Sequence, residues 1–320
     1  MCAPPASAAF VTVVFLGDLR LFAIQLASLE RFVDPEGFAE FSVFATSDAA
    51  PAVFSAVLRR LVNRHMGPAW RRRTHVERRP LALTAGDGYR RQQLLKLWAA
   101  ARTTARLAVV LDAKNSFVSP CCAADLWSSG KPRLACRTGS EEGDEGWGLA
   151  VATASRFWCM SPTKGQPYAA PFTPFVLLPG LARDMMSEAA ERLAGPGAPP
   201  DVAWEGFASS PKLALTTEFI WYSQYVISRY GSLDAVYTVG HDMSATLFGS
   251  LRPESRDLRL LRAAGPGGTP VIGIDRRRVG TLDQALLSEL ARLWSPLGLD
   301  PQRALGLKKW RRLNPFGGTA

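Results

Sequence analysis

The sequence predicts an α/β protein whose doubly wound, mostly parallel sheet is flanked by helices and followed by a C-terminal helical extension. Apolar, β-branched segments alternate with segments of helical periodicity, which is the pattern of a βαβ fold. The strand-like segments are apolar throughout, as expected of parallel strands buried on both faces. The chain has 320 residues, 47% hydrophobic and 21% charged, so it is long enough and apolar enough for a large folded core.

The first half of the chain carries the alternation most clearly. In order, the pattern predicts a strand over 10–16, a helix over 19–32, a strand over 41–46, a helix from about 51 to 63, a helix over 90–106 and a strand over 107–111. The helix over 90–106 leads directly into the strand after it, as in a βαβ crossover.

The second half is less regular. The pattern predicts an acidic, glycine-rich loop over 138–148, an aromatic helix over 216–230, a strand over 271–274, an amphipathic helix over 282–293 and a loose basic tail beyond Pro301. We expect one domain over 1–320, made of a nucleotide-binding half (8–118), an acceptor half (119–250) and a C-terminal strand and helix with the basic tail (251–320).

Three predicted strands of the first half end in an aspartate. Asp18, Asp48 and Asp112 each follow an apolar strand. Ligands of open α/β sheets bind outside the carboxyl ends of the strands, so these carboxylates predict a binding site. The alternative for each is a loop or helix cap, and for Asp48 the residues that follow favour helix initiation.

The charge balance narrows the class of partner. Lys and Arg exceed Asp and Glu by ten charges, which favours anionic partners, but the basic residues lie in short clusters, so no nucleic acid is expected. The five cysteines form no metal-binding spacing. Their odd number and the lack of a secretory signal or transmembrane segment predict a cytoplasmic protein.

Four segments resemble one protein family. They are Gly88–Leu97, Leu111–Asn115, Pro171–Phe175 and Thr217–Phe219. Together the chain from Phe10 to Trp294 is similar to an uncharacterised bacterial family related to GT-A-type glycosyltransferases. The resemblance implies a GT-A-like sheet, a nucleotide-diphosphate sugar donor (UDP by default) and an unknown sugar or polyol acceptor.

The resemblance also implies a metal-binding DxD motif after the strand that ends at Asp112. In such a motif two carboxylates hold Mn²⁺ or Mg²⁺ against the diphosphate. Here Lys114 stands where the second carboxylate is expected. Two possibilities therefore remain open: a divalent cation held by Asp112 with Asn115, or metal-free stabilisation of the diphosphate by Lys114 and Lys96.

The same resemblance implies roles for other residues. Gln92 and Lys96 are expected near the donor sugar and nucleotide, and Asp18 and Asp48 near the base and ribose. His241 is a candidate metal or diphosphate ligand, although a lone histidine is also commonly structural. We expect Asp275–Arg278 to lie on the surface, with one arginine as a candidate diphosphate contact.

Glu218 is a candidate catalytic residue beside Asp112. It opens the aromatic helix, where it is either a carboxylate stabilised by the helix dipole or a general base toward an acceptor hydroxyl. The sequence thus predicts a glycosyltransferase. The alternative is a non-catalytic nucleotide- or glycan-binding protein on the same scaffold, for which the missing second carboxylate is the main argument.

Overall fold

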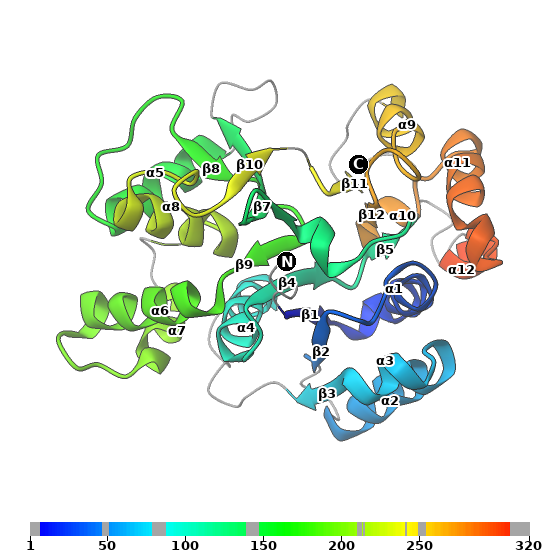
Figure 1. Ribbon diagram of the computed structural model, residues 1–320, viewed down its shortest axis with the longest axis horizontal. Helices are drawn as coiled ribbons and strands as arrows, with labels where there is room; N and C mark the ends of the chain where they lie inside the picture. Colours follow the sequence, from blue (N-terminus) through cyan, green and yellow to red (C-terminus); the bar gives the residue numbers. More distant parts are fainter. Residues whose placement is uncertain are drawn as a thin grey trace.

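The fold is that of a mixed α/β protein with a mostly parallel central sheet (Figure 1). The computed structural model describes residues 7–46, 51–78, 88–138, 147–209, 213, 215–240, 242–248 and 254–307. The central sheet has five strands in the order β3-β2-β1-β4-β9. These strands are β1 (Ala8–Val14), β2 (Phe38–Ala45), β3 (Thr74–Arg78), β4 (Leu107–Asp112) and β9 (Phe175–Leu177).

The first four strands of this sheet are parallel, and β9 pairs antiparallel with β4. Because β2 and β4 lie on opposite sides of β1, the strand order reverses between β1 and β4. The loops that follow these two strands diverge at this point and leave a crevice between them, which is where doubly wound sheets bind ligands.

Helices cover both faces of the central sheet. One face carries α1 (Leu19–Phe32), α2 (Pro51–His65) and α3 (Pro68–Arg73), and the other carries α4 (Gly88–Arg102), α5 (Trp147–Phe157), α6 (Pro179–Ala194), α7 (Pro200–Ser209) and α8 (Glu218–Tyr230). In β1, Val11 and Val13 join the core under the second group, whereas Phe10 and Val14 join the core under the first. This alternation explains why the strand is apolar on both faces except at Thr12, whose buried hydroxyl donates to the Leu111 carbonyl at 3.2 Å.

Two smaller sheets pack beside the central one. The first contains β6 (Trp127–Ser128), β7 (Lys131–Thr138), β8 (Pro167–Ala169) and β10 (Thr238–Gly240). The second contains β5 (Asn115–Phe117), β11 (Ser244–Leu247) and β12 (Val271–Ile274). Because β5 follows β4 after a two-residue turn and pairs with β12, the end of β12 lies next to the end of β4.

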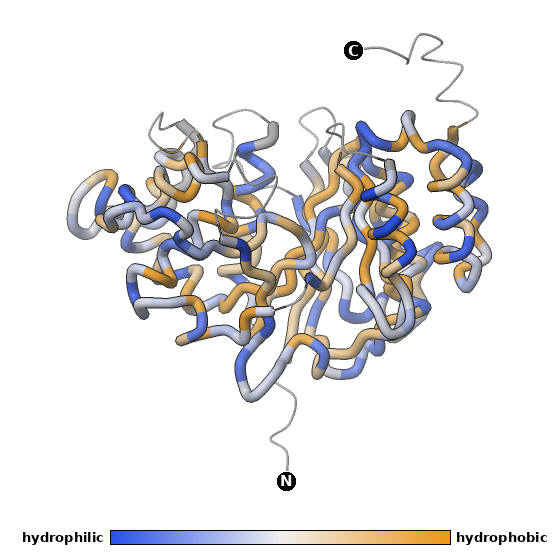
Figure 2. The backbone as a smooth tube through the Cα atoms, turned by 90° about the horizontal axis from the view of Figure 1, so that it is seen from above, coloured by the Kyte–Doolittle hydropathy of each residue, from blue (hydrophilic) through white to orange (hydrophobic). Residues whose placement is uncertain are grey.

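The C-terminal extension is helical, as predicted. It consists of α9 (Glu254–Arg262), α10 (Arg276–Val279), α11 (Gln284–Trp294) and α12 (Pro301–Leu305), which pack on the second small sheet and on α1. The segment after Pro301 was expected to be a loose tail, but its first residues form α12. Asp300 caps this helix by accepting a hydrogen bond from the Arg303 N–H at 2.7 Å. Figure 2 shows apolar segments concentrated along the central strands.

Most predicted elements are confirmed. The helix over 19–32 and the strand over 271–274 have the predicted bounds, while α4 ends at Arg102, four residues before its predicted end. The acidic run of the predicted loop over 138–148 lies outside the described residues, and α5 already begins at Trp147. Within the described part of the chain, no helix is both long and apolar enough to cross a membrane.

Candidate functional site

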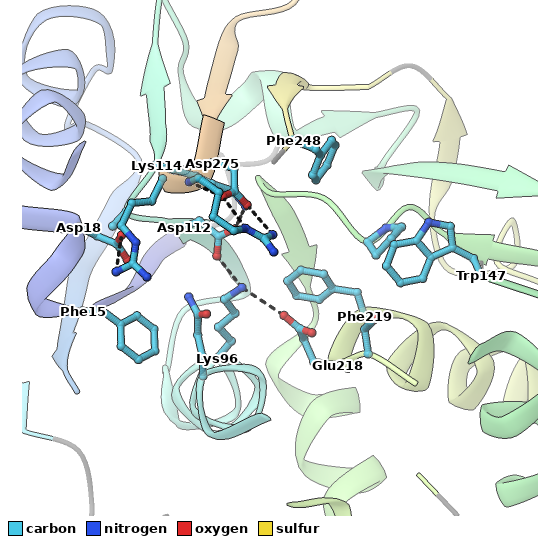
Figure 3. Close-up of a pocket in the computed structure, with 16 residues that line it drawn as sticks. Phe15, Asp18, Lys96, Asp112, Lys114, Trp147, Glu218, Phe219, Phe248 and Asp275 are labelled. Atoms are coloured by element: carbon cyan, nitrogen blue, oxygen red, sulfur yellow. Dashed lines mark hydrogen bonds and ion pairs between the residues drawn. The ribbon is translucent and has the colours of Figure 1, made fainter. Parts of the chain in front are cut away.

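A cavity of about 580 Å³ lies at the carboxyl ends of β1 and β4, where the strand order reverses (Figure 3). Its lining combines four carboxylates, four cationic side chains and four aromatic rings. The lining residues are Phe15, Asp18, Gln92, Lys96, Asp112, Ala113, Lys114, Trp147, Pro171, Thr217, Glu218, Phe219, Phe248, Asp275, Arg276 and Arg277. The sequence-predicted residues Asp18, Gln92, Lys96, Asp112, Lys114 and Glu218 all meet here.

The loop after β1 contributes Phe15 and Asp18. Asp18 precedes α1 at the N-cap position, but its side chain makes no capping hydrogen bond. It faces the cavity instead, where its Oδ1 lies 4.0 Å from Nη1 of Arg276. Burial raises the pKa of Asp18 above its ordinary value, and the Arg276 guanidinium partly offsets this effect.

The turn after β4 is fixed by hydrogen bonds to the backbone of Asp112. Its N–H donates to Oδ1 of Asn115 at 2.7 Å, and its carbonyl accepts from Nε2 of Gln25 at 2.7 Å. Asn115 in turn donates from Nδ2 to the Thr173 carbonyl at 3.1 Å. Asn115 is therefore buried in the turn and does not line the cavity, so the structure does not support its expected role as a metal or cofactor ligand.

The Asp112 carboxylate is held between two ammonium groups. Its Oδ1 lies 2.5 Å from Nζ of Lys96, and its Oδ2 lies 3.1 Å from Nζ of Lys114. The Thr173 hydroxyl also donates to Oδ2 at 3.1 Å. Burial alone would raise the pKa of Asp112, but Lys114 and Lys96 together hold it well below its ordinary value.

Lys96 connects Asp112 to Glu218 (Figure 3). Its Nζ lies 3.2 Å from Oε1 of Glu218 and 5.4 Å from the centre of the Phe219 ring. The side chains of Lys96 and Glu218 are 7% and 5% exposed, so this is a buried ion pair. Burial raises the pKa of Glu218 above its ordinary value, Lys96 lowers it, and nearby Asp112 raises it.

Glu218 is positioned by the start of α8. Thr217 is the N-cap residue, and its Oγ1 accepts a hydrogen bond from the Ile220 N–H at 3.4 Å. The Phe219 ring stacks on Phe175 of β9 with centroids 4.0 Å apart. The central sheet thus anchors the first turn of this helix beside the cavity, and Glu218 is held there with it.

The loop after β12 brings Asp275, Arg276 and Arg277 to the cavity, although these residues were expected on the surface, with one arginine as a candidate diphosphate contact. Asp275 caps α10 by accepting from the Arg277 N–H at 2.9 Å, and it also pairs with the Arg277 guanidinium at 3.1 Å. Arg276 and Arg277 both line the cavity. The signal that identified Asp18 and Asp112, an aspartate directly after an apolar strand, is also present at Asp275.

Aromatic side chains from α5, α8 and the end of β11 also line the cavity. Trp147 begins α5 and Phe248 follows β11, and neither was singled out from the sequence. Phe219, next to Glu218, also lines the cavity, but its ring is buried and stacks on Phe175 (Figure 3). Phe248 lies on the side of Lys114, with its ring centre 5.8 Å from Nζ of Lys114. Gln92 lies on α4 one helical turn before Lys96 and also lines the cavity. Asp48 and His241 lie outside the described residues.

The donor set around Asp112 does not fit a divalent cation. Among the residues that the structure describes, no three His, Cys, Asp or Glu side chains converge as metal ligands. Both oxygens of Asp112 face ammonium groups, and the Asn115 oxygen is occupied by a backbone N–H. A cation at this position would have to displace a buried lysine from its carboxylate partner.

A second cavity, of about 870 Å³, lies between β7, β10 and the turn that precedes β12. Its charged lining residues contact neighbouring groups. Asp125 accepts from the Cys122 N–H at 2.7 Å, Arg133 donates to the Trp127 carbonyl at 3.1 Å, and Asp242 pairs with Arg137. We regard the cavity at the carboxyl ends of β1 and β4 as the candidate functional site because it lies where the strand order reverses and gathers most of the sequence-predicted residues.

Fold and site together define a mixed α/β protein with a charged and aromatic cavity at the switch point of its central sheet. Neither the protein-family models nor the curated proteins contain a match to this chain.

Proposed function

We propose that this protein is a glycosyltransferase that moves a sugar from a nucleotide-diphosphate donor, UDP-sugar by default, to a sugar or polyol acceptor. The observation that supports the proposal most directly is the chain of buried charges from Asp112 through Lys96 to Glu218. It joins a cationic region, suited to a leaving diphosphate, to a carboxylate beside aromatic rings. Sugars commonly present their apolar C–H faces to such rings.

The donor occupies the side of the cavity between β1 and β4. Asp18 offers a carboxylate to the ribose or base, and Gln92 an amide to the sugar. The leaving diphosphate carries the negative charge that develops in the transition state. Preorganised positive charge in a partly buried site is therefore the main catalytic requirement, and the cationic lining residues meet it.

Glu218 acts as the general base. The acceptor hydroxyl oxygen forms a bond to the anomeric carbon of the sugar, and its proton moves to a carboxylate oxygen of Glu218. The bond from the anomeric carbon to the diphosphate oxygen breaks, and the nucleoside diphosphate leaves with the electron pair. Lys96 positions Glu218 and limits how far burial raises the pKa of its carboxyl group.

The test is Glu218→Gln, which keeps the shape of the side chain and removes its charge. General bases contribute roughly 10²- to 10⁴-fold, so we expect turnover of the UDP-sugar to fall by that factor while the Kd of UDP stays unchanged. Glu289→Gln, on α11 away from the cavity, is the matched control. Release of UDP from a panel of UDP-sugars with mixed acceptors measures turnover.

The pH profile gives a second readout of the same role. A base must be ionised to act, and burial raises the pKa of Glu218 above its ordinary value. Turnover should therefore increase with pH through an apparent pKa higher than that of an ordinary glutamate, and this limb should be missing in the residual activity of Glu218→Gln. Full turnover by Glu218→Gln would contradict the assigned role. UDP-sugar binding without any turnover by the unmodified chain would favour the alternative of a binding protein.

A further inference from the structure

The leaving diphosphate needs a positively charged partner. The cationic side chains of the cavity differ in how much of each is exposed and in which element carries it. Lys96 also lines the cavity, but its side chain is only 7% exposed and lies between Asp112 and Glu218. Lys114 and Arg276 line the cavity from two different loops, after β4 and after β12. These two loops are joined because the Ile274 N–H donates to the Lys114 carbonyl at 3.2 Å.

Asp112 orients the Lys114 ammonium at the cavity surface. Nζ of Lys114 lies 3.1 Å from Oδ2 of Asp112 and 5.8 Å from the centre of the Phe248 ring, and the side chain is 23% exposed. An ammonium group has three N–H donors, so a partner on one side leaves donors for a phosphate oxygen on another. The positive charge of Lys114 thus lies at the cavity surface beside the Asp112 carboxylate.

Arg276 is held over the loop after β1. A Cβ atom added at Gly17 would lie 2.0 Å from Nη1 of Arg276, which shows that the guanidinium packs directly on the glycine backbone. Its side chain is 58% exposed, and the nearest carboxylate, Asp18, is 4.0 Å away. A planar guanidinium at this position can bind two phosphate oxygens at once.

We propose that Lys114 and Arg276 bind the diphosphate group of the donor directly, with no divalent cation between phosphate and protein. Asp112 then acts as a positioning residue for Lys114 instead of a metal ligand. The inference rests on the proposed function for the identity of the donor. That the cavity contains a cationic site for a diphosphate group is inferred from its geometry alone.

The experiment is titration calorimetry of the full chain with two probes, UDP and inorganic pyrophosphate, each in EDTA and in Mg²⁺. We expect the Kd of UDP in EDTA to lie within about twofold of its value in Mg²⁺. Loss of a charge-assisted hydrogen bond should raise a Kd by roughly tenfold or more, so Lys114→Met and Arg276→Met should each weaken both probes by that factor. Arg262→Met on α9, whose side chain is 65% exposed, is the matched control.

Gly17→Ala provides a second variant that leaves every charge in place. The added methyl group meets the far end of a flexible side chain, so it should displace Arg276 without disturbing the fold. We expect the Kd of pyrophosphate to rise as in Arg276→Met, with no change in the midpoint of thermal unfolding.

The outcomes separate this inference from the proposed function. UDP binding that requires Mg²⁺, or unchanged affinity in Lys114→Met and Arg276→Met, would overturn the inference and leave the transferase proposal standing. Pyrophosphate binding in EDTA without any binding of UDP would support the inference and refute the proposed donor. Failure of both probes to bind in either condition would overturn both.

Discussion

Lys96 is the residue on which the buried charges of the cavity depend. It lies between the carboxylates of Asp112 and Glu218, at 2.5 and 3.2 Å. Two carboxylates in a buried environment repel each other and lose hydration, so a cation between them is needed to keep both ionised. Lys96 thereby connects the donor side of the cavity to the acceptor side.

Replacing this cation should destabilise the fold. In Lys96→Met the apolar stem is kept, but Glu218 and one oxygen of Asp112 lose their partner. Removing one member of a buried ion pair costs about 3 kcal/mol or more, and urea denaturation at neutral pH should show this loss. Because the pKa of Glu218 is already raised, Glu218 should take up a proton before Asp112 does, so the loss of stability should shrink as the pH falls from neutral into the acidic range.

The double variant Lys96→Met/Glu218→Gln is the control, since it removes one of the two uncompensated charges. It should recover part of the lost stability. An unchanged urea midpoint in Lys96→Met would mean that the ion pairs contribute nothing to the fold.

At the residue scale the sequence predicted part of this site. The resemblance implied a site role for Lys96, and Asp112 was a candidate because it follows an apolar strand. The Asn115 side chain, predicted as a ligand, instead contacts backbone groups of Asp112 and Thr173, because an asparagine that follows a strand can satisfy backbone groups of its own turn. One arginine of 276–278 was a candidate diphosphate contact, but the position of Arg276 at the cavity depends on the long-range pairing of β5 with β12.

At the scale of elements, a buried ion pair holds α10 and the loop that carries Arg276. Nε and Nη2 of Arg278 donate to Oδ2 of Asp257 on α9 at 3.1 and 2.8 Å. The Asp257 side chain is fully buried, and that of Arg278 largely so. Because α10 has four residues, this anchor and the Asp275 cap define where Arg276 lies.

The anchor can be tested with Asp257→Asn. The substitution removes the charge that compensates Arg278 and should lower the free energy of unfolding by about 3 kcal/mol, as measured in urea. It should also raise the Kd of pyrophosphate severalfold, although Asp257 does not line the cavity. Asp300→Asn, which alters the cap of α12, is the comparison and should leave the Kd unchanged. Normal affinity in Asp257→Asn would show that α10 is positioned by other contacts.

The observed ends of the helices agree with local signals in the sequence, namely apolar periodicity and capping residues. The helix over 19–32 was predicted with its observed bounds because its apolar periodicity is regular. The short helix α12 was missed, although Asp300 before a proline and Gly306 after the last turn are typical capping signals. Its φ of +69° at Gly306 is the left-handed conformation that favours glycine at a helix end.

At the scale of the whole molecule, the cavity is assembled from segments that are far apart in the sequence. Besides residues of α4 and the first turn of α8, its lining includes the loops that follow β1, β4 and β12, and the antiparallel pairing of β5 with β12 brings the third loop to the other two. Alternating apolar segments predicted β1, β2 and β4 of the central sheet, and an apolar run predicted β12 of the second small sheet. The remaining strands of the three sheets were not predicted, since most are short and no local pattern indicates how they pair.

The most direct test of the central claim is hydrogen–deuterium exchange of the full chain with and without UDP in EDTA. Ligand binding stabilises the segments that it contacts against local opening. We predict slower exchange in peptides that cover 15–18, 112–118 and 271–279, with no change in peptides from the second cavity, 119–134 and 238–240. Protection confined to the second cavity, or no protection anywhere in the chain, would contradict a nucleotide-diphosphate site at the end of β1 and β4.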